Sequence, residues 1–273
     1  MRVIIGAGEA VKPVLTQFGK DENYTVVHLE VSKKGDTMEE YEAQFPESTI
    51  KKAFRGKAPR GCDAVFVVHA GAAVNGILLR AMEILKAKDA TISVLYLIPS
   101  LASLSTKEDT NHNFTFGVLQ ELARSGLLEK MYIIDVDRVE GMLENIPVAK
   151  YEEYLNTYIT SNFSMINYFN HVAPAVHIPT EVPLGARICT LASFSFETNP
   201  QDFFTLQNTT TRHYYFGVSK KQLEEDGTLF RKIKEFMKTQ DDKGVNTGFS
   251  IHEVELEIPR IWRACYSSEP QKT

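Results

Sequence analysis

Cysteine is scarce in this chain of 273 residues, and long apolar runs are absent. The three cysteines, Cys62, Cys189 and Cys265, are far apart and form no C-x-x-C pair. The sequence therefore predicts neither a disulfide framework nor a thiolate zinc site, and it is typical of a protein from a reducing compartment. No apolar stretch approaches the roughly 20 residues that a membrane-spanning helix needs. The segment before Gly6 is too short for the apolar region of a signal peptide, so we expect a cytoplasmic protein without a membrane segment.

Excess positive charge is also missing. The chain has 30 Lys and Arg residues against 35 Asp and Glu residues, a formal net charge of -5, and no long basic run. Because nonspecific nucleic-acid binding depends on neutralising phosphates, we expect no nucleic-acid partner. A hydrophobic content of 43% in a chain of this length is sufficient for a deep core in one or two domains.

Several catalytic and metal-binding motifs are absent. The sequence contains neither G-x-x-x-x-G-K-[ST] nor G-x-S-x-G, which gives no basis for a P-loop hydrolase or an acyl-transfer enzyme. His171, His177 and His213 lack the spacing that places two ligands on one helix face. We therefore expect no metal site built from side chains.

Short apolar runs alternate with helical patterns in the first half, which is typical of βαβ units around a parallel sheet. The predicted strands are Val3–Ile5, Tyr24–Val31, Cys62–His69, Thr91–Ile98 and Met131–Val136, and the predicted helices are Glu9–Phe18, Pro46–Phe54, Ile77–Lys88 and Phe114–Leu127. This order predicts an α/β fold with a doubly wound, mostly parallel sheet.

The pattern changes after residue 150. A long helix is predicted from Tyr151 to Val172, and three prolines follow it. The remaining predicted elements are the strands Ala186–Phe196, His213–Val218, Ile251–Ile258 and Ile261–Tyr266 and the helix Gly227–Thr239. We therefore predict an α/β domain over 1–150, a central helix over 151–172 and a smaller α+β domain over 173–273, with a solvated tail from Ser267.

Two loops of small residues follow predicted strands and precede predicted helices. The first contains Gly6 and Gly8, and the second is Ala70–Gly76. Ligands of open α/β sheets bind at the carboxyl ends of strands, where helix starts attract phosphate, so both loops can face one ligand. Glu30 lies where a dinucleotide-binding protein has its ribose contact, although the third fingerprint glycine is missing. Tight turns and close helix packing are the alternative explanations for the small residues.

The order of these motifs resembles the tubulin/FtsZ family of GTP-binding filament proteins. The family has a D-x-V-F-V strand that leads into G-G-G-T-G-T-G, and here residues 63–67 lead into Ala70-Gly71-Ala72-Ala73-Val74-Asn75-Gly76. The distance to Thr91 also matches. Residues 116–122 and 132–135 and the helix near Asn156 extend the resemblance, which covers residues 1–172.

The resemblance implies a site for GTP or GDP, with Mg²⁺, and a homopolymer assembled head to tail. The implied nucleotide-binding residues are Gly6, Gly8, Gly71, Ala72, Asn75, Gly76, Asp137 and Asn156. In this assignment Asp137 lies near the ribose and base, and Asn156 recognises guanine from the central helix. An ordinary solvated helix position is the alternative for Asn156.

The chain also departs from the family pattern. Ala70, Ala72 and Val74 replace glycines of the signature loop, and Ala73 and Asn75 replace its threonines. Of the acidic residues that the family places after the central helix, only Glu181 remains as a candidate general base. These departures predict weak binding and slow or lost hydrolysis, and they are similar to those of phage or plasmid branches of the family.

Self-association is the last expectation. Residues 172–179 after the central helix are apolar and rich in proline, which suits either a subunit contact or a domain linker. Two other hypotheses stay open at this point. One is a dinucleotide-dependent enzyme that uses Gly6, Gly8 and Glu30, and the other is a structural protein that kept the fold without nucleotide.

Overall fold

A computed structural model describes residues 2–31, 35–143, 146–240, 242–256 and 258–273. The chain forms two compact units, Met1–Thr160 and Ser161–Thr273. The division falls inside the long helix α7 (Tyr151–Phe169), which therefore contributes to both units.

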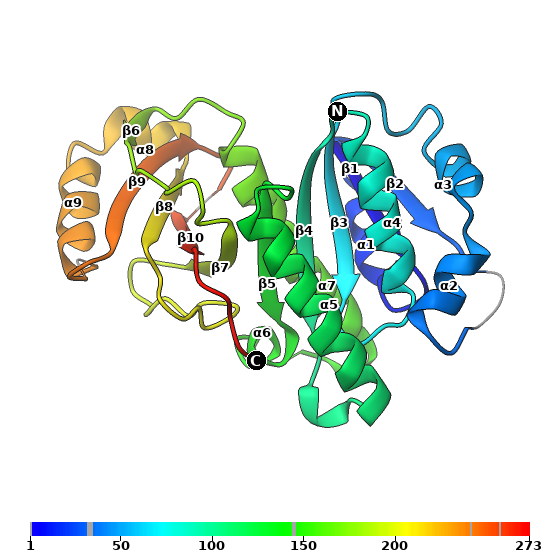
Figure 1. The fold of residues 1–273 in the computed structure, drawn as a ribbon. Helices are drawn as coiled ribbons and strands as arrows, with labels where there is room; N and C mark the ends of the chain where they lie inside the picture. The colour runs from blue at the N-terminus through cyan, green and yellow to red at the C-terminus, as the bar shows by residue number, and fades with distance from the viewer. Residues whose placement is uncertain (1, 32–34, 144–145, 241, 257) are drawn as a thin grey trace. The chain divides into compact units, whose positions relative to one another are not determined.

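The first unit is built on five parallel strands (Figure 1). They are β1 (Arg2–Ala7), β2 (Tyr24–Leu29), β3 (Asp63–His69), β4 (Thr91–Ile98) and β5 (Lys130–Asp135), and their order in the sheet is β2-β1-β3-β4-β5. The central strands are buried almost throughout, which explains their continuous apolar sequences. The predicted α/β fold class is confirmed.

The chain winds in one direction from β1 to β2 and in the other from β3 to β5. Because such crossovers are right-handed, α1 and α4 lie on opposite faces of the sheet, as a doubly wound fold requires. The helices of this unit are α1 (Lys12–Phe18), α2 (Met38–Gln44), α3 (Glu47–Ala53), α4 (Asn75–Lys86), α5 (Thr106–Arg124) and α6 (Val136–Glu140), with 3-10 turns at Leu101–Ser103 and Val148–Lys150.

Three helices of the first unit differ from the prediction. The helices α2 and α6 were not predicted, and α5 begins at Thr106 instead of Phe114. Ser105 and Glu108 form a capping box that starts α5 in a polar stretch, where apolar periodicity gives no signal. The first turn of α5 thereby reaches the loop after β3.

The second unit contains a mixed sheet with the order β7-β10-β8-β9-β6. Its strands are β6 (Val176–Ile178), β7 (Ile188–Phe194), β8 (Thr211–Val218), β9 (Asn246–Glu253) and β10 (Arg260–Ser267), and its helices are α8 (Lys220–Glu225) and α9 (Leu229–Thr239). Strands β8 and β9 are parallel, while β10 is antiparallel to β7 and β8. The elements β6 and α8 were not predicted.

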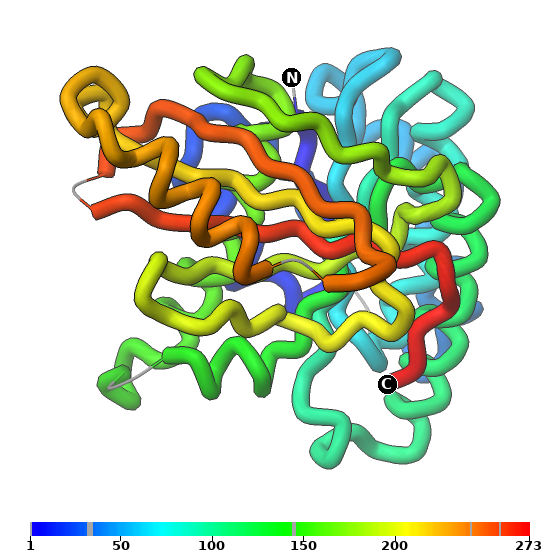
Figure 2. The backbone as a smooth tube through the Cα atoms, turned by 90° about the vertical axis from the view of Figure 1, so that its left-hand side faces the viewer, coloured from blue at the N-terminus to red at the C-terminus, as the bar shows by residue number. Residues whose placement is uncertain are grey.

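Each face of this second sheet has its own cover. Helix α9 lies across the strands in Figure 2, and its Leu229 and Ile233 join an aromatic core with Phe216 and Phe249. On the other face, the Trp262 indole donates a 2.9 Å hydrogen bond to Asn162 of α7. The second unit therefore holds the end of the long helix against its own sheet.

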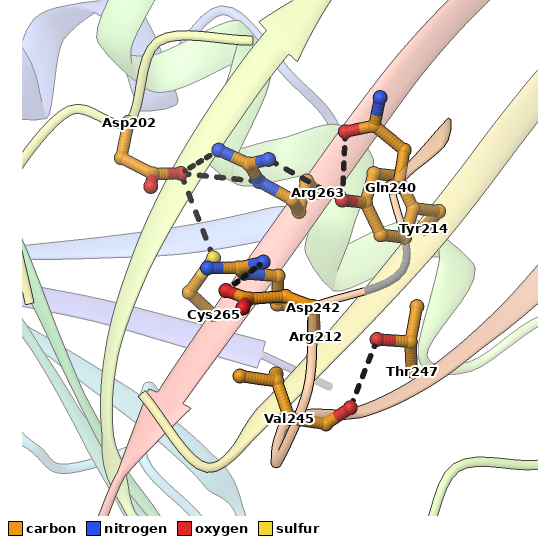
Figure 3. Close-up of polar contacts among 9 residues, drawn as sticks. All are labelled: Asp202, Arg212, Tyr214, Gln240, Asp242, Val245, Thr247, Arg263 and Cys265. Atoms are coloured by element: carbon orange, nitrogen blue, oxygen red, sulfur yellow. Dashed lines mark hydrogen bonds and ion pairs between the residues drawn. The ribbon is translucent and has the colours of Figure 1, made fainter. Parts of the chain in front are cut away.

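A polar cluster lies beside that aromatic core (Figure 3). Arg263 is 6% exposed and pairs with Asp202 at 2.7 Å. Its guanidinium also donates to Tyr214 Oη at 3.3 Å, and Tyr214 donates to Gln240. Burial raises the pKa of the Cys265 thiol to about 12, so this cysteine stays protonated beside Asp202. The cluster fastens the loop after β7 to the sheet.

Two predictions in the second unit are wrong. The strand placed at Ile251–Ile258 runs from Asn246 to Glu253, because parallel pairing with β8 extends it through Gly248; Glu257 lies outside the described residues. The tail from Ser267 is also not simply solvated. Gln271 is 3% exposed, and its Oε1 accepts a 2.6 Å hydrogen bond from the Gln207 amide.

Candidate nucleotide site

The two small-residue loops lie next to each other at the carboxyl edge of the first sheet. Gly8 has a φ of +79°, and a Cβ on it would lie 3.1 Å from Cγ1 of Val74. His28 Nε2 lies 2.9 Å from Gly8 O, so the imidazole steadies the first loop from β2. The sequence reasoning did not find His28, whose only signal is a polar residue near the end of a half-buried strand.

Both loops contain backbone N–H groups that have no backbone acceptor among the described residues. The amides of Gly71, Ala73 and Val74 donate to no described backbone carbonyl, and the same holds for Glu9 and Ala10. The amides of residues 73 and 74 precede the first turn of α4, whose N-terminal end carries partial positive charge. Open amides from two loops at one sheet edge can receive an anion such as phosphate.

Two glycines of the second loop have packing roles of their own. A Cβ on Gly71 would meet the Glu108 backbone oxygen at 3.1 Å, and Gly71 has a φ of +81°. A Cβ on Gly76 would lie 2.6 Å from Met38 O. The starts of α5 and α2 therefore pack against the loop. This close packing explains part of the glycine pattern that the resemblance assigns to nucleotide binding.

The side chain of Asn75 is used in a hydrogen bond within the fold. It is 1% exposed, and its Nδ2 donates to His69 O at 2.9 Å, which fixes the loop to the end of β3. His69 Nδ1 lies 3.0 Å from Ala70 O, and burial lowers the pKa of this imidazole. Ala72 is half-buried, and its amide donates to His69 O at 3.4 Å. These two residues shape the loop more than they offer polar groups to a ligand.

Asp137 and Asn156 lie on α6 and α7 of the same unit. Asp137 is exposed, and Tyr151 nearby has a pKa raised to about 12 by burial and by the Glu140 carboxylate. Asn156 is half-buried, and its carboxamide makes no hydrogen bond within the described part of the chain. Lys20 and Glu153 pair at 3.8 Å, which places the first turn of α7 beside the end of α1. The Asn156 carboxamide is therefore available to a ligand.

Gly6 belongs to β1 itself. A Cβ there would lie 2.8 Å from Cγ2 of Val11, so Gly6 permits α1 to pack closely on the strand. Glu181 lies in the second unit, separate from the compact unit that holds the other candidates, and its side chain is exposed.

The described residues include no group of three or more His, Cys, Asp or Glu side chains that could hold a metal ion. Within the same residues, none of the helices combines the length and the apolar character needed to cross a membrane.

Comparison with solved structures identifies the fold. The empty FtsZ dimer of M. jannaschii matches with a TM-score of 0.68 at 12% identity, over 98% of this chain and 88% of that chain. The four-stranded TubZ-Bt filament matches with a TM-score of 0.71 at 12% identity, over 98% and 86%. The chain has the tubulin/FtsZ fold. The GTPgS-bound protofilament of CetZ2 from Haloferax volcanii agrees, with a TM-score of 0.68 at 12% identity, over 97% and 92%.

The tubulin/FtsZ fold extends beyond the 172 residues that carry the sequence resemblance. No protein-family model and no curated protein sequence matches the chain. The fold is thus preserved at identities of 11% to 13% in the matched structures. Buried apolar patterning is sufficient for this, because many sequences of similar pattern and volume fill the same core.

Proposed function

We propose that the protein binds a guanine nucleotide at the two small-residue loops and assembles head to tail into filaments. The observation that carries the proposal is the pair of adjacent loops with open amides at the sheet edge of a tubulin/FtsZ fold. The matched CetZ2 structure is a GTPgS-bound protofilament, and the TubZ-Bt structure is a filament. We extend both properties to this chain.

In this proposal the amides of Gly71, Ala73 and Val74 hold phosphate, and Asn156 contacts the base. Mg²⁺ bound with the nucleotide would neutralise phosphate charge. The Cβ atoms that Ala70, Ala72 and Val74 add to the loop, where the family has glycines, limit affinity. Hydrolysis is slow or lost, because Glu181 is the one carboxylate in the segment after α7 up to residue 187.

Ala73→Asp tests the nucleotide site. Residue 73 is half-buried at the start of α4, so an Asp there favours the helix by about 0.3–1 kcal/mol while its charge repels phosphate. We expect wild type to bind a fluorescent GTP analogue and the variant to bind at least about tenfold more weakly, a loss of about 1.4 kcal/mol. Ala87→Asp, at the exposed opposite end of α4, is the matched charge control. Equal affinities in all three proteins would refute this site.

Gly71→Val is a poor test, although the loop pattern suggests it. The φ of +81° and the close Glu108 backbone mean that any side chain there strains the fold. A loss of binding could then come either from a distorted fold or from a lost contact with the nucleotide.

Assembly is tested by light scattering and electron microscopy at rising protein concentration, with GTP, with GDP and without nucleotide. We expect linear polymers above a critical concentration, with slow phosphate release that Glu181→Gln lowers further. A protein that remains monomeric under all three conditions would remove the filament proposal and leave nucleotide binding alone.

A further inference from the structure

The segment after α7 is bound to the sheet of the second unit and is not a free linker. Residues 176–181, which we call the strap, begin as β6 and pair with β9. The strap then crosses Gly248, where a Cβ would lie 2.8 Å from Ile178 O and would also collide with Thr180 Oγ1. Thr180 Oγ1 lies 2.8 Å from Nδ1 of His213. The crossing depends on a glycine and on one imidazole.

The strap ends at Glu181, the carboxylate proposed above for hydrolysis. Its carbonyl oxygen accepts hydrogen bonds from Asn246 Nδ2 at 2.8 Å and from Thr211 Oγ1 at 3.5 Å. The backbone of Glu181 is therefore held by β8 and β9 while its side chain is exposed. Any change that frees the strap also frees this carboxylate.

A buried relay continues from the strap into the sheet. Ser250 Oγ lies 3.0 Å from Nε2 of His213 and 2.9 Å from Nε2 of His252. Ser250 is 3% exposed and His252 is 2% exposed. The other ring nitrogen of His252, Nδ1, is buried without a hydrogen-bond partner in the described structure.

The hydrogen-bond partners determine which nitrogen of each histidine in this relay carries the proton. A buried N–H without an acceptor costs more than an unused lone pair, so His252 carries its proton on Nε2 and donates to Ser250. The single Ser250 proton then goes to Nε2 of His213, whose Nδ1–H donates to Thr180. The N–H of His252, the O–H of Ser250 and the N–H of His213 are thereby each used once.

An additional proton has no place in this arrangement. On Nε2 of His213 it would displace the Ser250 hydrogen, and on Nδ1 of His252 it would be buried without an acceptor. Among the facing groups, Phe169 of α7 and Tyr215 of β8 pack on His252, at centroid distances of 4.5 and 6.1 Å.

Two further titratable groups face His213. His177 of β6 lies 5.9 Å from its ring, and Tyr215 lies 4.6 Å from it. Neither His177 nor His252 forms an ion pair within the described residues. Neighbouring imidazoles that both carry a proton repel each other, and within the described residues no ion pair offsets the charge of His177 or His252.

We propose that the strap is a proton-sensitive positioning device: the neutral relay through His213, Ser250 and His252 holds Glu181 and the adjoining contact surface in place, and protonation of the relay releases them. His213 and His252 are positioning residues in this scheme, since they act through Thr180 and the strap backbone. Their influence on assembly rests on the proposed function, whereas the release of the strap does not.

The pH window follows from His252. Burial, followed by the charge of His177, lowers the pKa of His252 from 6.5 to about 4 in the closed state. In the released state the imidazole returns toward its ordinary value, so release takes up a proton between these limits. The closed strap is therefore fully favoured above pH 6.5 and loses that advantage as the pH falls toward about 4.

Hydrogen exchange of residues 175–181 in the full chain tests the proposal between pH 8 and pH 4.5. After correction for intrinsic exchange, we expect protection of the wild-type strap to fall by about tenfold or more below pH 6.5. His252→Gln and His213→Gln keep an amide in place of Nε2 without titrating, so at least one of them moves the fall to lower pH. His171→Gln, an exposed histidine near the end of α7, is the matched control and leaves the profile unchanged.

Gly248→Ala opens the strap without changing a histidine, and we expect low protection at every pH. Emission from Trp262, the single tryptophan, reports whether the second unit stays folded. Protection that does not vary with pH, or wild-type profiles in both glutamine variants, would overturn the proposal. A pH-dependent strap in a protein that never assembles would instead overturn only the filament function.

Discussion

Among the single residues, close packing explains why glycine occupies several positions that otherwise look like ligand contacts. Gly76 lies within the first turn of α4, where the Met38 carbonyl oxygen would be 2.6 Å from an added Cβ. A Cβ on Gly6 would instead meet a side-chain atom, Cγ2 of Val11, at 2.8 Å. The small residues of both loops thus serve packing, and the open amides are the part that a ligand can use.

Gly76→Ala should lower the free energy of unfolding by about 1–3 kcal/mol, because the new methyl group displaces the start of α2. Gly117→Ala in α5 is the matched control. No atom lies within 4 Å of its added Cβ, so better helix propensity should stabilise the protein by about 0.5–1 kcal/mol. Urea unfolding measures both. A Gly76→Ala protein as stable as wild type would contradict the close contact between α2 and α4.

Among the helices and strands, a buried ion pair and an exposed ion pair contribute differently to stability. The Arg263 side chain is 7% exposed and that of Asp202 is 24% exposed, so their pair is largely shielded from solvent. Arg212 of β8 pairs at 3.2 Å with Asp242, which lies in the turn between α9 and β9 and is 55% exposed. The first pair anchors the loop after β7, whereas water screens the second (Figure 3).

Asp202→Ala should destabilise the second unit by about 3 kcal/mol, because it leaves the Arg263 guanidinium buried without its carboxylate. Asp202→Asn, which keeps an acceptor, should cost less. Asp242→Ala is the exposed control and should change stability by less than about 1 kcal/mol. Thermal unfolding of the three variants provides the test, and equal losses from Asp202→Ala and Asp242→Ala would disprove the difference in burial.

At the scale of the whole molecule, the proposed filament needs an exposed surface beside the strap. Leu184 is 87% exposed and Val182 is 40% exposed, so apolar side chains do face outward there. Val176, which the sequence pattern also suggests for this contact, packs against the aromatic core of the second unit. A charge at residue 176 would disturb that core, and Leu184 is the better position for a test.

Leu184→Asp should raise the critical concentration for assembly by about tenfold or more, because it places an unpaired charge in the proposed contact. The melting temperature of the monomer should stay unchanged, since residue 184 is exposed. Ile258→Asp, at another exposed apolar position, is the control. Sedimentation at rising concentration measures the effect, and equal assembly of Leu184→Asp and wild type would exclude this surface.

Elements with a regular burial pattern could be predicted from the amino-acid sequence. Continuous apolar runs predicted all five strands of the first unit, and helical periodicity predicted α4, α7 and α9 within a few residues. The loops at strand ends pointed to one edge of the sheet, which the contact between Gly8 and Val74 confirms. These features are local, because a strand or helix buried on a known face repeats its apolar residues at a fixed period.

Features that depend on residues far apart in the sequence became visible only in the folded chain. The capping box at Ser105 extended α5 to the second loop, and Met38 explained Gly76. The strap was expected to be a linker or a contact surface, yet residues far along the chain hold it, including His213 and Ser250. A hydrogen bond between side chains so far apart leaves no periodic trace in either segment, so sequence pattern gives no signal for it.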